Sequence, residues 1–442
     1  MQHHTPIERL VNLIDPSANL IFNMSVEDAI ECVGSGDPAR IREIDGQFAL
    51  LHKQGIRIRM ARSIGRPMRY FLAKRAEGPC LVVAERIDEI RDFLKSEGLD
   101  GQFHPSYTRM VPAHHLVELS LVGCPDPNPK MNRYLDPERN RWSADLDEIG
   151  RNYVGALAEE ISHWLDRIPK NEPIGVLFSG GIDSGAVLLV TYHLLLKRGE
   201  SPARFKAFTL SVNEGAADAI QAERFLAELD LGMFWEPVQV SSDQLDYREA
   251  IAVIEDYKPL DVQAATMTLA LCKGIRERYP DWKYLLDGDG GDENLKDYPI
   301  EANPELTIRS VLNNLMLYQE GWGVDAVKHS LTYSGGQSRG HVRSSAPVRK
   351  LGFQGFSPYA TSNVIDVAEG IPFIELTDWQ HERLYELKGQ ILQRGVEQLT
   401  GMTMPIFEKR RFQEGAIDQQ GFRELFPAEE LTYRQAFAKQ YE

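Results

Sequence analysis

Cysteine is scarce in this sequence, with four residues among 442. Cys32, Cys80, Cys124 and Cys272 lie far apart, and they form neither a C-x-x-C pair nor a zinc-like pairing with histidine. A disulfide framework and a cysteine-rich zinc centre are therefore not expected. Residues 1–9 also lack the basic region and apolar run of a signal peptide. We expect a reduced, cytoplasmic protein.

Long apolar runs and an excess of basic charge are missing too. No stretch reaches about 18 consecutive apolar residues, the length needed to cross a bilayer, so no membrane association is expected. The 65 acidic residues outnumber the 49 basic ones, and a net charge of -16 would repel a phosphate backbone, which argues against a nucleic-acid partner. The sequence does contain 43% hydrophobic residues, and its length predicts two or more domains.

The first part of the chain has the pattern of a small α+β domain. Short apolar runs alternate with turns, which predicts a small antiparallel sheet with one or two helices. These runs are at residues 48–51, 56–58, 69–72, 80–83 and 116–119. Three prolines between Cys124 and Lys130 then favour an extended connection. We therefore predict one domain at residues 1–125 and a second at 140–442.

The second part has the pattern of an α/β domain. Apolar residues recur at helical spacing over residues 145–168, which predicts an amphipathic helix. Strand-like runs then alternate with helical stretches, and this alternation predicts a parallel sheet with helices on both faces. The predicted strands are at residues 174–178, 205–212, 235–240 and 284–286.

Beyond about residue 305 the pattern is mainly helical, apart from a Gly/Ser/Arg-rich stretch at residues 334–345. Cationic side chains in or just after this stretch could clamp a substrate carboxylate, but the composition favours a surface loop. They are Arg339, His341, Arg343, Arg349 and Lys350.

Residues 179–184, S-G-G-I-D-S, lie between a predicted strand and a predicted helix. Gly180 and Gly181 allow the backbone to approach an anion, and the helix N-terminus supplies free N–H groups. Ser179 and Ser184 add hydroxyl donors, and Asp183 beside a phosphate implies a cation, so pyrophosphate with magnesium is the expected ligand. The lysine of a G-x-x-x-x-G-K-[ST] loop is missing. A glycine turn with a serine helix cap is the structural alternative.

A second candidate site is the acidic run at residues 285–293, which places four carboxylates in seven residues. Their mutual repulsion would be costly without a cation. A calcium loop counted from Asp287 fails, because its sixth position is Asp292 instead of glycine and its twelfth is Tyr298 instead of glutamate. A solvated acidic turn remains the alternative.

These two segments resemble the signatures of asparagine synthetases, which belong to the N-type ATP pyrophosphatases with an adenine nucleotide alpha hydrolase-like fold. The resemblance implies ATP and Mg²⁺ as cofactors, with Asp183 and Asp292 as metal ligands. It places Asp289 and Glu293 at the reacting centre. Asparagine synthetases usually have glutamate where Asp289 stands, and the related β-lactam synthetases have tyrosine. The implied nucleotide-binding residues are Ser179, Gly180, Gly181, Asp183, Ser184, Gly288 and Leu210, the last on the strand where the family binds adenine.

A late lysine would answer a chemical need, because a fixed ammonium stabilises negative charge on the adenylate phosphate and the acyl oxygen. Residues 388–394 and 404–415 resemble the paired K-x-x-L-R and R-x-K-x-x-F segments of these synthetases. The family's spacing from Gly415 selects Lys409, although Phe407 stands where an arginine is usual. The resemblance thus implies Lys409, Asp289 and Glu293 as catalytic residues. A solvated charge run is the alternative for residues 409–411.

The first domain resembles the later half of a class II (Ntn) glutaminase domain. The similar segments are residues 45–50, 61–67 and 83–85. That family needs a cysteine directly after the initiator methionine, where Gln2 stands here, and Cys32 is internal. We therefore expect a degenerate domain without glutaminase activity.

Together these features predict an ATP-dependent ligase that adenylates a small carboxylate, releases pyrophosphate and transfers the acyl group to ammonia or an amine. The ammonia could be free or come from a separate glutaminase, and an amine on the same molecule would give a lactam. Two other functions stay open, a sulfur-transfer enzyme acting on tRNA and a non-catalytic ATP-binding scaffold. The identity of the acid and of the nitrogen nucleophile stays open as well, as does assembly into a homo-oligomer.

Overall fold

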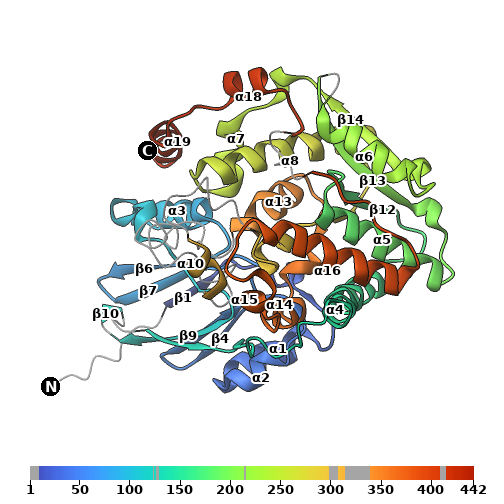
Figure 1. Ribbon diagram of the computed structural model, residues 1–442. Helices are drawn as coiled ribbons and strands as arrows, with labels where there is room; N and C mark the ends of the chain where they lie inside the picture. Colours follow the sequence, from blue (N-terminus) through green and yellow to red (C-terminus); the bar gives the residue numbers. More distant parts are fainter. Residues whose placement is uncertain are drawn as a thin grey trace. The chain divides into compact units, whose positions relative to one another are not determined.

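The computed structural model describes residues 9–122, 124–125, 129–213, 216–297, 307–313, 339–408 and 415–442. The chain divides into two compact units, whose elements are labelled in Figure 1. Among the described residues, unit 1 comprises positions 9–136, 339 and 441–442, and unit 2 comprises the rest. In this part of the chain, the structure contains no helix with both the length and the apolar character needed to span a bilayer.

Unit 1 contains two larger sheets, where the sequence predicted one antiparallel sheet. The first runs in the order β1 (Arg9–Asn12), β7 (Gly78–Ala84), β6 (Arg69–Arg75) and β8 (Arg109–Met110). The second runs β10 (Cys124–Pro125), β9 (His115–Val122), β5 (Arg57–Arg62) and β4 (Ala49–Gln54), with β11 (Lys130–Arg133) also on β9. The predicted strands are present, but β1 pairs with β7 in parallel. Periodicity within one strand cannot say which sheet the strand joins.

The middle strands of unit 1 are buried on both faces. Tyr70 and Leu81 pack into a core with Met60 and Val117 of the other sheet. The alternating residues on the opposite face, including Phe71, pack under α3 (Ile87–Ser96). The remaining elements of this unit are α1 (Val26–Ser35), α2 (Pro38–Arg42), β2 (Leu20–Ile21) and β3 (Gly46–Gln47).

Unit 2 is built on a five-stranded parallel sheet flanked by helices, which confirms the predicted α/β fold. The strand order is β14 (Trp235–Val240), β13 (Phe205–Val212), β12 (Ile174–Leu177), β15 (Tyr284–Leu286) and β16 (Gln354–Phe356). The first four strands were predicted from their apolar runs. The edge strand β16 was missed, because three residues containing a glycine give no apolar run.

Two groups of helices complete unit 2 (Figure 1). The helices that come first in the chain are α4 (Leu146–Asp166), α5 (Ile182–Lys197), α6 (Ala217–Ala227), α7 (Tyr247–Ile254), α8 (Pro259–Arg278) and α9 (Gly291–Asn294). The later helices are α10 (Ile308–Asn313), α13 (Arg339–Lys350), α14 (Ser362–Glu369), α15 (Phe373–Thr377), α16 (Arg383–Thr400), α18 (Gln419–Leu425) and α19 (Glu430–Lys439). Helices α4 and α16 approach closely where Gly150 faces Gly395, since a Cβ on Gly395 would overlap the Gly150 carbonyl.

Helix α13 corrects the prediction of a surface loop for the cationic residues from position 339 onward. Residues 339–350 are helical, and Val348 is buried against Gly355 of β16. Glycine and serine lower local helix propensity, but burial of an apolar side chain against the sheet edge outweighs this low propensity.

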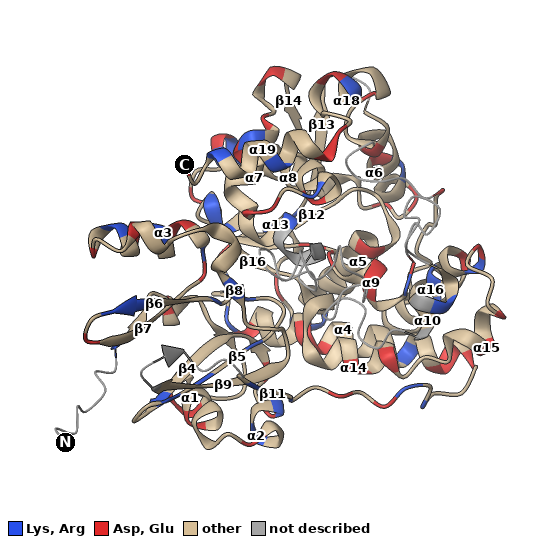
Figure 2. Cartoon of the chain, turned by 90° about the vertical axis from the view of Figure 1, so that its left-hand side faces the viewer, with Lys and Arg blue, Asp and Glu red and all other residues tan. Residues whose placement is uncertain are grey.

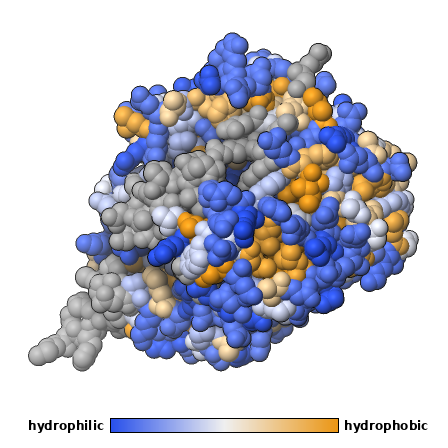
Figure 3. All heavy atoms as spheres, viewed as in Figure 1, coloured by the Kyte–Doolittle hydropathy of each residue, from blue (hydrophilic) through white to orange (hydrophobic). Residues whose placement is uncertain are grey.

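On the face of the molecule drawn in Figure 3, hydrophobic residues gather in separate patches within a mainly hydrophilic surface.

Candidate active site

The S-G-G-I-D-S loop leaves β12 after Leu177 and enters α5, whose N-cap is Gly181. Gly180 has φ +75°, and a Cβ at this position would lie 2.7 Å from the Ala222 backbone nitrogen. Only glycine therefore fits without strain. Within the loop, the Gly181 N–H donates to Ser179 Oγ at 3.3 Å. These features hold the first turn of α5 in a shape suited to an anion.

The acidic loop packs directly against this turn. A Cβ at Gly288 would lie 2.8 Å from the Ser184 backbone nitrogen, and a Cβ at Gly291 would overlap Asp183 Oδ1. Figure 2 shows the acidic residues of α9 beside α5. Two motifs more than a hundred residues apart in the sequence thus form one surface at the carboxyl ends of β12 and β15, where parallel sheets bind ligands.

Lys388 of α16 joins the two motifs. Its Nζ donates to Asp183 Oδ2 at 2.5 Å and also to Asp292 Oδ1. Asp297 Oδ2 lies 3.6 Å from the same nitrogen. The lysine side chain is only 2% exposed. The structure therefore brings the two predicted metal ligands together around one buried ammonium.

The sequence indicates the segment that contains Lys388, but the family's spacing selects Lys409 as the functional lysine. Lys409 lies outside the described residues. The sequence does contain a pattern that indicates Lys388. This lysine lies on the buried stripe of an amphipathic helix, between the buried Leu387 and the buried Ile391. Such a lysine needs a carboxylate partner.

The charges of this cluster depend on each other. Burial raises the pKa of Asp183, and the nearby Lys388 ammonium opposes this shift, so that the pKa is about 6. For Lys388, burial lowers the pKa, but Asp183 and Asp292 together raise it well above its usual range. Lys388 therefore stays protonated at neutral pH, and each aspartate beside it is stabilised as a carboxylate.

The donor set around Asp183 fits a divalent cation. Asp183 Oδ1 is buried and has no hydrogen-bond partner among the described residues. Three carboxylates, from Asp183, Asp292 and Asp297, lie around the Lys388 ammonium, so several carboxylate oxygens gather at this point. Oxygen ligands are those that Mg²⁺ prefers. The unpartnered Asp183 oxygen and the neighbouring carboxylates suit Mg²⁺ carried by a nucleotide.

Asp289 precedes the Gly290 N-cap of α9, and Glu293 lies within this helix. Arg343 of α13 approaches both, with its Nε 3.6 Å from Asp289 Oδ1 and a terminal nitrogen 3.5 Å from Glu293 Oε1. Burial raises the pKa of Glu293 to about 7, which Arg343 partly opposes. Burial also raises the pKa of Asp289. Arg343, predicted to lie on a surface loop, thus belongs to the site.

Asp287 anchors the start of the acidic loop. Its Oδ1 accepts the Asp289 N–H at 3.0 Å, and its Oδ2 accepts the Ser357 hydroxyl at 2.9 Å. Ser357 directly follows β16, so the missed fifth strand supports the loop. Leu210 lies on β13 opposite Val238 of β14, and its side chain is buried. Its predicted contact with the nucleotide stays a prediction.

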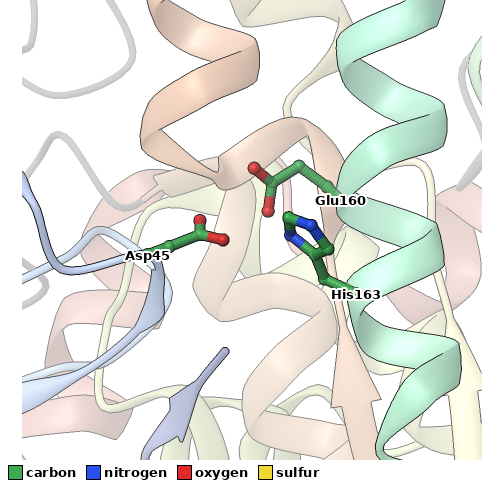
Figure 4. A group of neighbouring side chains, drawn as sticks. All are labelled: Asp45, Glu160 and His163. Carbon is green, nitrogen blue, oxygen red and sulfur yellow. The ribbon is translucent and has the colours of Figure 1, made fainter. Parts of the chain in front are cut away.

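Helix α4 carries another pair of potential metal ligands. Figure 4 shows Glu160 and His163 close together on this helix, and Asn363 donates to Glu160 Oε1 at 2.6 Å. Asp45, drawn in the same figure, belongs to unit 1. Unit 2 thus supplies two of these ligands, fewer than a structural metal centre requires.

Replacing Gly291 with alanine is expected to weaken ATP binding about 10-fold and to cost about 1–3 kcal/mol of unfolding free energy. The added Cβ would displace the Asp183 carboxylate. Titration calorimetry and urea unfolding measure the two effects. Gly155→Ala is the matched control, because Gly155 lies at an exposed position of α4 and nothing lies within 4 Å of its Cβ position. That substitution is expected to stabilise the helix. Unchanged ATP affinity in Gly291→Ala would contradict the packing of the two loops.

Comparison with known proteins agrees with the motifs. Residues 165–356 match the family described as asparagine synthase, a range that contains both loops and β12 to β16. A probable asparagine synthetase [glutamine-hydrolyzing] of Acanthamoeba polyphaga mimivirus is 27% identical over 146 residues. The alignment covers 32% of this chain and 25% of that protein, so the chain spans about a quarter of the length of this curated relative.

Proposed function

We propose that this chain, which carries an asparagine synthetase-like domain at residues 165–356, is an ATP-dependent ligase that joins a carboxylate to a nitrogen nucleophile. The family match supports an ATP-dependent amide ligase in general. The observation that carries the proposal is the convergence of Asp183 and Asp292 on buried Lys388, beside the loop at residues 179–184.

The first step of the proposed reaction is adenylation. The carboxylate oxygen of the substrate attacks the α-phosphorus of ATP, the bond to the β-phosphate oxygen breaks, and pyrophosphate leaves into the loop at residues 179–184. Backbone N–H groups at the start of α5 and the Lys388 ammonium stabilise the charge that builds on the leaving group. Mg²⁺ bound at Asp183 and Asp292 would neutralise phosphate charge and orient the chain of phosphates.

The second step is acyl transfer. Ammonia or an amine attacks the carbonyl carbon of the acyl-adenylate, AMP leaves, and one proton is lost from nitrogen. Glu293 lies next to Asp292 in α9, and Asp289 precedes the N-cap of this helix, so both lie near the proposed phosphate site, which suits a role next to the reacting carbon. Lys409 retains its proposed role in stabilising the acyl oxygen.

The proposal includes no glutaminase activity in unit 1, where the described Cys32 and Cys80 are buried and burial raises the pKa of the Cys80 thiol. Unit 1 then acts as a scaffold, and ammonia enters free or from a separate glutaminase.

ATP–pyrophosphate exchange with a panel of carboxylic acids tests this function. With Mg²⁺ present, at least one acid is expected to support exchange, and full turnover with ammonium chloride is expected to yield AMP and pyrophosphate. Glutamine is expected not to replace ammonium chloride. Formation of ADP and phosphate would overturn the adenylation mechanism. ATP binding without exchange for any acid would instead support the scaffold function.

A further inference from the structure

A buried polar network lies behind the proposed phosphate site in unit 2. Its three members are Tyr153 of α4, Asn294 at the end of α9 and Tyr359 in the short helix η8 (Pro358–Ala360) after β16. Both tyrosines are 0% exposed, and Asn294 is 3% exposed. Buried polar groups are costly unless they are hydrogen-bonded, and apolar residues would fill this core without that requirement. Filling the core therefore does not explain these polar groups.

Asn294 connects α9 to two other elements. Its Nδ2 donates to the Tyr359 backbone oxygen at 2.9 Å and to the Tyr153 hydroxyl at 3.3 Å. A carbonyl oxygen can only accept, so the amide nitrogen must face it, and both N–H groups of this nitrogen are used. Asn294 follows Asp292 by two residues in the same helix. Its hydrogen bonds therefore fix the helix that carries Asp292.

Tyr359 connects the same helix to α5. Its backbone oxygen accepts from Asn294, and its hydroxyl donates to the backbone oxygen of Asp183 at 3.3 Å. The ring between these two ends stacks on Tyr153, with the ring centroids 6.0 Å apart. Gly290, the N-cap of α9, packs against it, because a Cβ there would lie 3.1 Å from Tyr359 Cβ. Tyr359 is thus a spacer of fixed length between the two loops.

We propose that Tyr359 and Asn294 are positioning residues that set the spacing of Asp183 and Asp292, the two proposed Mg²⁺ ligands. Each acts on the backbone of the element that carries an aspartate, so neither has to contact the ion. Mg²⁺ demands near-ideal octahedral geometry with ligand oxygens at about 2.0–2.1 Å, so a small change in the spacing of two carboxylates weakens its binding. The inference rests on the metal site of the proposed function and adds the residues that adjust it.

The first experiment removes one hydroxyl. Tyr359→Phe keeps the stacked ring but loses the donor to Asp183. ATP affinity of the full-length chain is measured by titration calorimetry, once with MgCl₂ and once with EDTA. The ratio of the two dissociation constants measures how much Mg²⁺ tightens ATP binding. In Tyr359→Phe this ratio is expected to fall about 5-fold from the wild-type value, the factor that corresponds to one hydrogen bond, with little change in EDTA.

Tyr433→Phe is the matched control. Tyr433 is also a 0% exposed tyrosine of unit 2, and its hydroxyl also donates to a backbone oxygen, that of Pro427, at 3.0 Å. It lies on α19, which carries none of the proposed site residues. The two substitutions are expected to lower the urea midpoint to a similar extent. Only Tyr359→Phe is expected to reduce the effect of Mg²⁺ on ATP binding.

A second variant removes the other connection. Asn294→Leu replaces the amide by an apolar group of similar size, so both of its hydrogen bonds are lost. The effect of Mg²⁺ on ATP binding is expected to fall about 10-fold or more, because two bonds are missing instead of one. Should Asn294→Leu fail to fold, the two tyrosine variants decide alone.

The outcomes separate this inference from the proposed function. If no acid supports ATP–pyrophosphate exchange in the wild-type chain, the ligase function fails, whereas calorimetry still tests the spacing of the metal ligands. If Mg²⁺ tightens ATP binding equally in the wild type, Tyr359→Phe and Tyr433→Phe, the positioning role is overturned and the ligase function stands. A loss of ATP affinity in Tyr359→Phe by the same factor in MgCl₂ and in EDTA would indicate a merely structural role and would also overturn it.

Discussion

Replacing Lys388 with methionine is expected to lower ATP–pyrophosphate exchange by about 100-fold or more and to reduce the unfolding free energy by about 3–5 kcal/mol. Lys388 is the ammonium on which Asp183 and Asp292 converge, and it is almost fully buried. Without it the two carboxylates repel each other, and the proposed pyrophosphate site loses its fixed positive charge. Exchange kinetics and urea unfolding measure the two losses.

A matched control separates the two roles of Lys388. Lys283→Met removes a lysine that forms a surface ion pair with Glu172, so it is expected to change neither quantity appreciably. Adding Asp183→Asn to Lys388→Met is expected to recover part of the stability, because it removes one repelling charge, but none of the exchange. If Lys388→Met kept full exchange, the phosphate site would lie elsewhere.

Both functional loops could be predicted from the sequence because their chemistry is local. The glycines of residues 179–184 and 288–291, and the carboxylates next to them, specify a backbone shape and a charge without reference to distant residues. Their direct contact also follows from topology, since neighbouring parallel strands bring their carboxyl ends together. Adjacent strands β12 and β15 do so here.

The central position of Lys388 could not be predicted in the same way. It lies 96 residues from Asp292 and 205 residues from Asp183. Its position depends on how α16 is rotated against α4 and α5, which is a matter of tertiary packing. The sequence indicates only that a lysine on the buried stripe of this helix must have a partner.

Arg343 and β16 were missed for a related reason. Local composition around them is rich in glycine and serine, so neither helix nor strand is favoured by propensity. Strand β16 forms because β15, at the edge of the parallel sheet, supplies its backbone partners. Burial of Phe356 stabilises this strand, and burial of Val348 stabilises α13, the helix that carries Arg343. Local sequence therefore predicts a loop of cations, whereas tertiary contacts place Arg343 on a helix beside Asp289.

The buried ion pair between Lys296 and Glu369 gives the second large prediction. Lys296 Nζ lies 3.1 Å from Glu369 Oε1 and 3.3 Å from Oε2, with the two side chains 2% and 5% exposed. It connects the end of the acidic loop to α14. Lys296→Met alone is expected to reduce the unfolding free energy by about 3–5 kcal/mol, because Glu369 keeps its charge in a buried position.

Replacing both partners tests whether the cost comes from the unpaired charge. The double variant Lys296→Met, Glu369→Leu is expected to have an unfolding free energy within about 1–2 kcal/mol of the wild type, since two apolar side chains need no partner charge. Urea unfolding of the four variants in a double-mutant cycle measures the coupling. Lys273→Met, from the more exposed pair with Glu249, is the control and is expected to cost at most about 1 kcal/mol.

The same variants test how the ion pair supports the site. Lys296 follows Asp292 by four residues, so a loosened Lys296 would let the acidic loop move relative to α5. ATP–pyrophosphate exchange is therefore expected to fall in Lys296→Met and to recover in the double variant together with stability. If the double variant instead lost the sum of the two single costs, each residue would act through separate contacts, and the ion pair would not be what holds the loop in place.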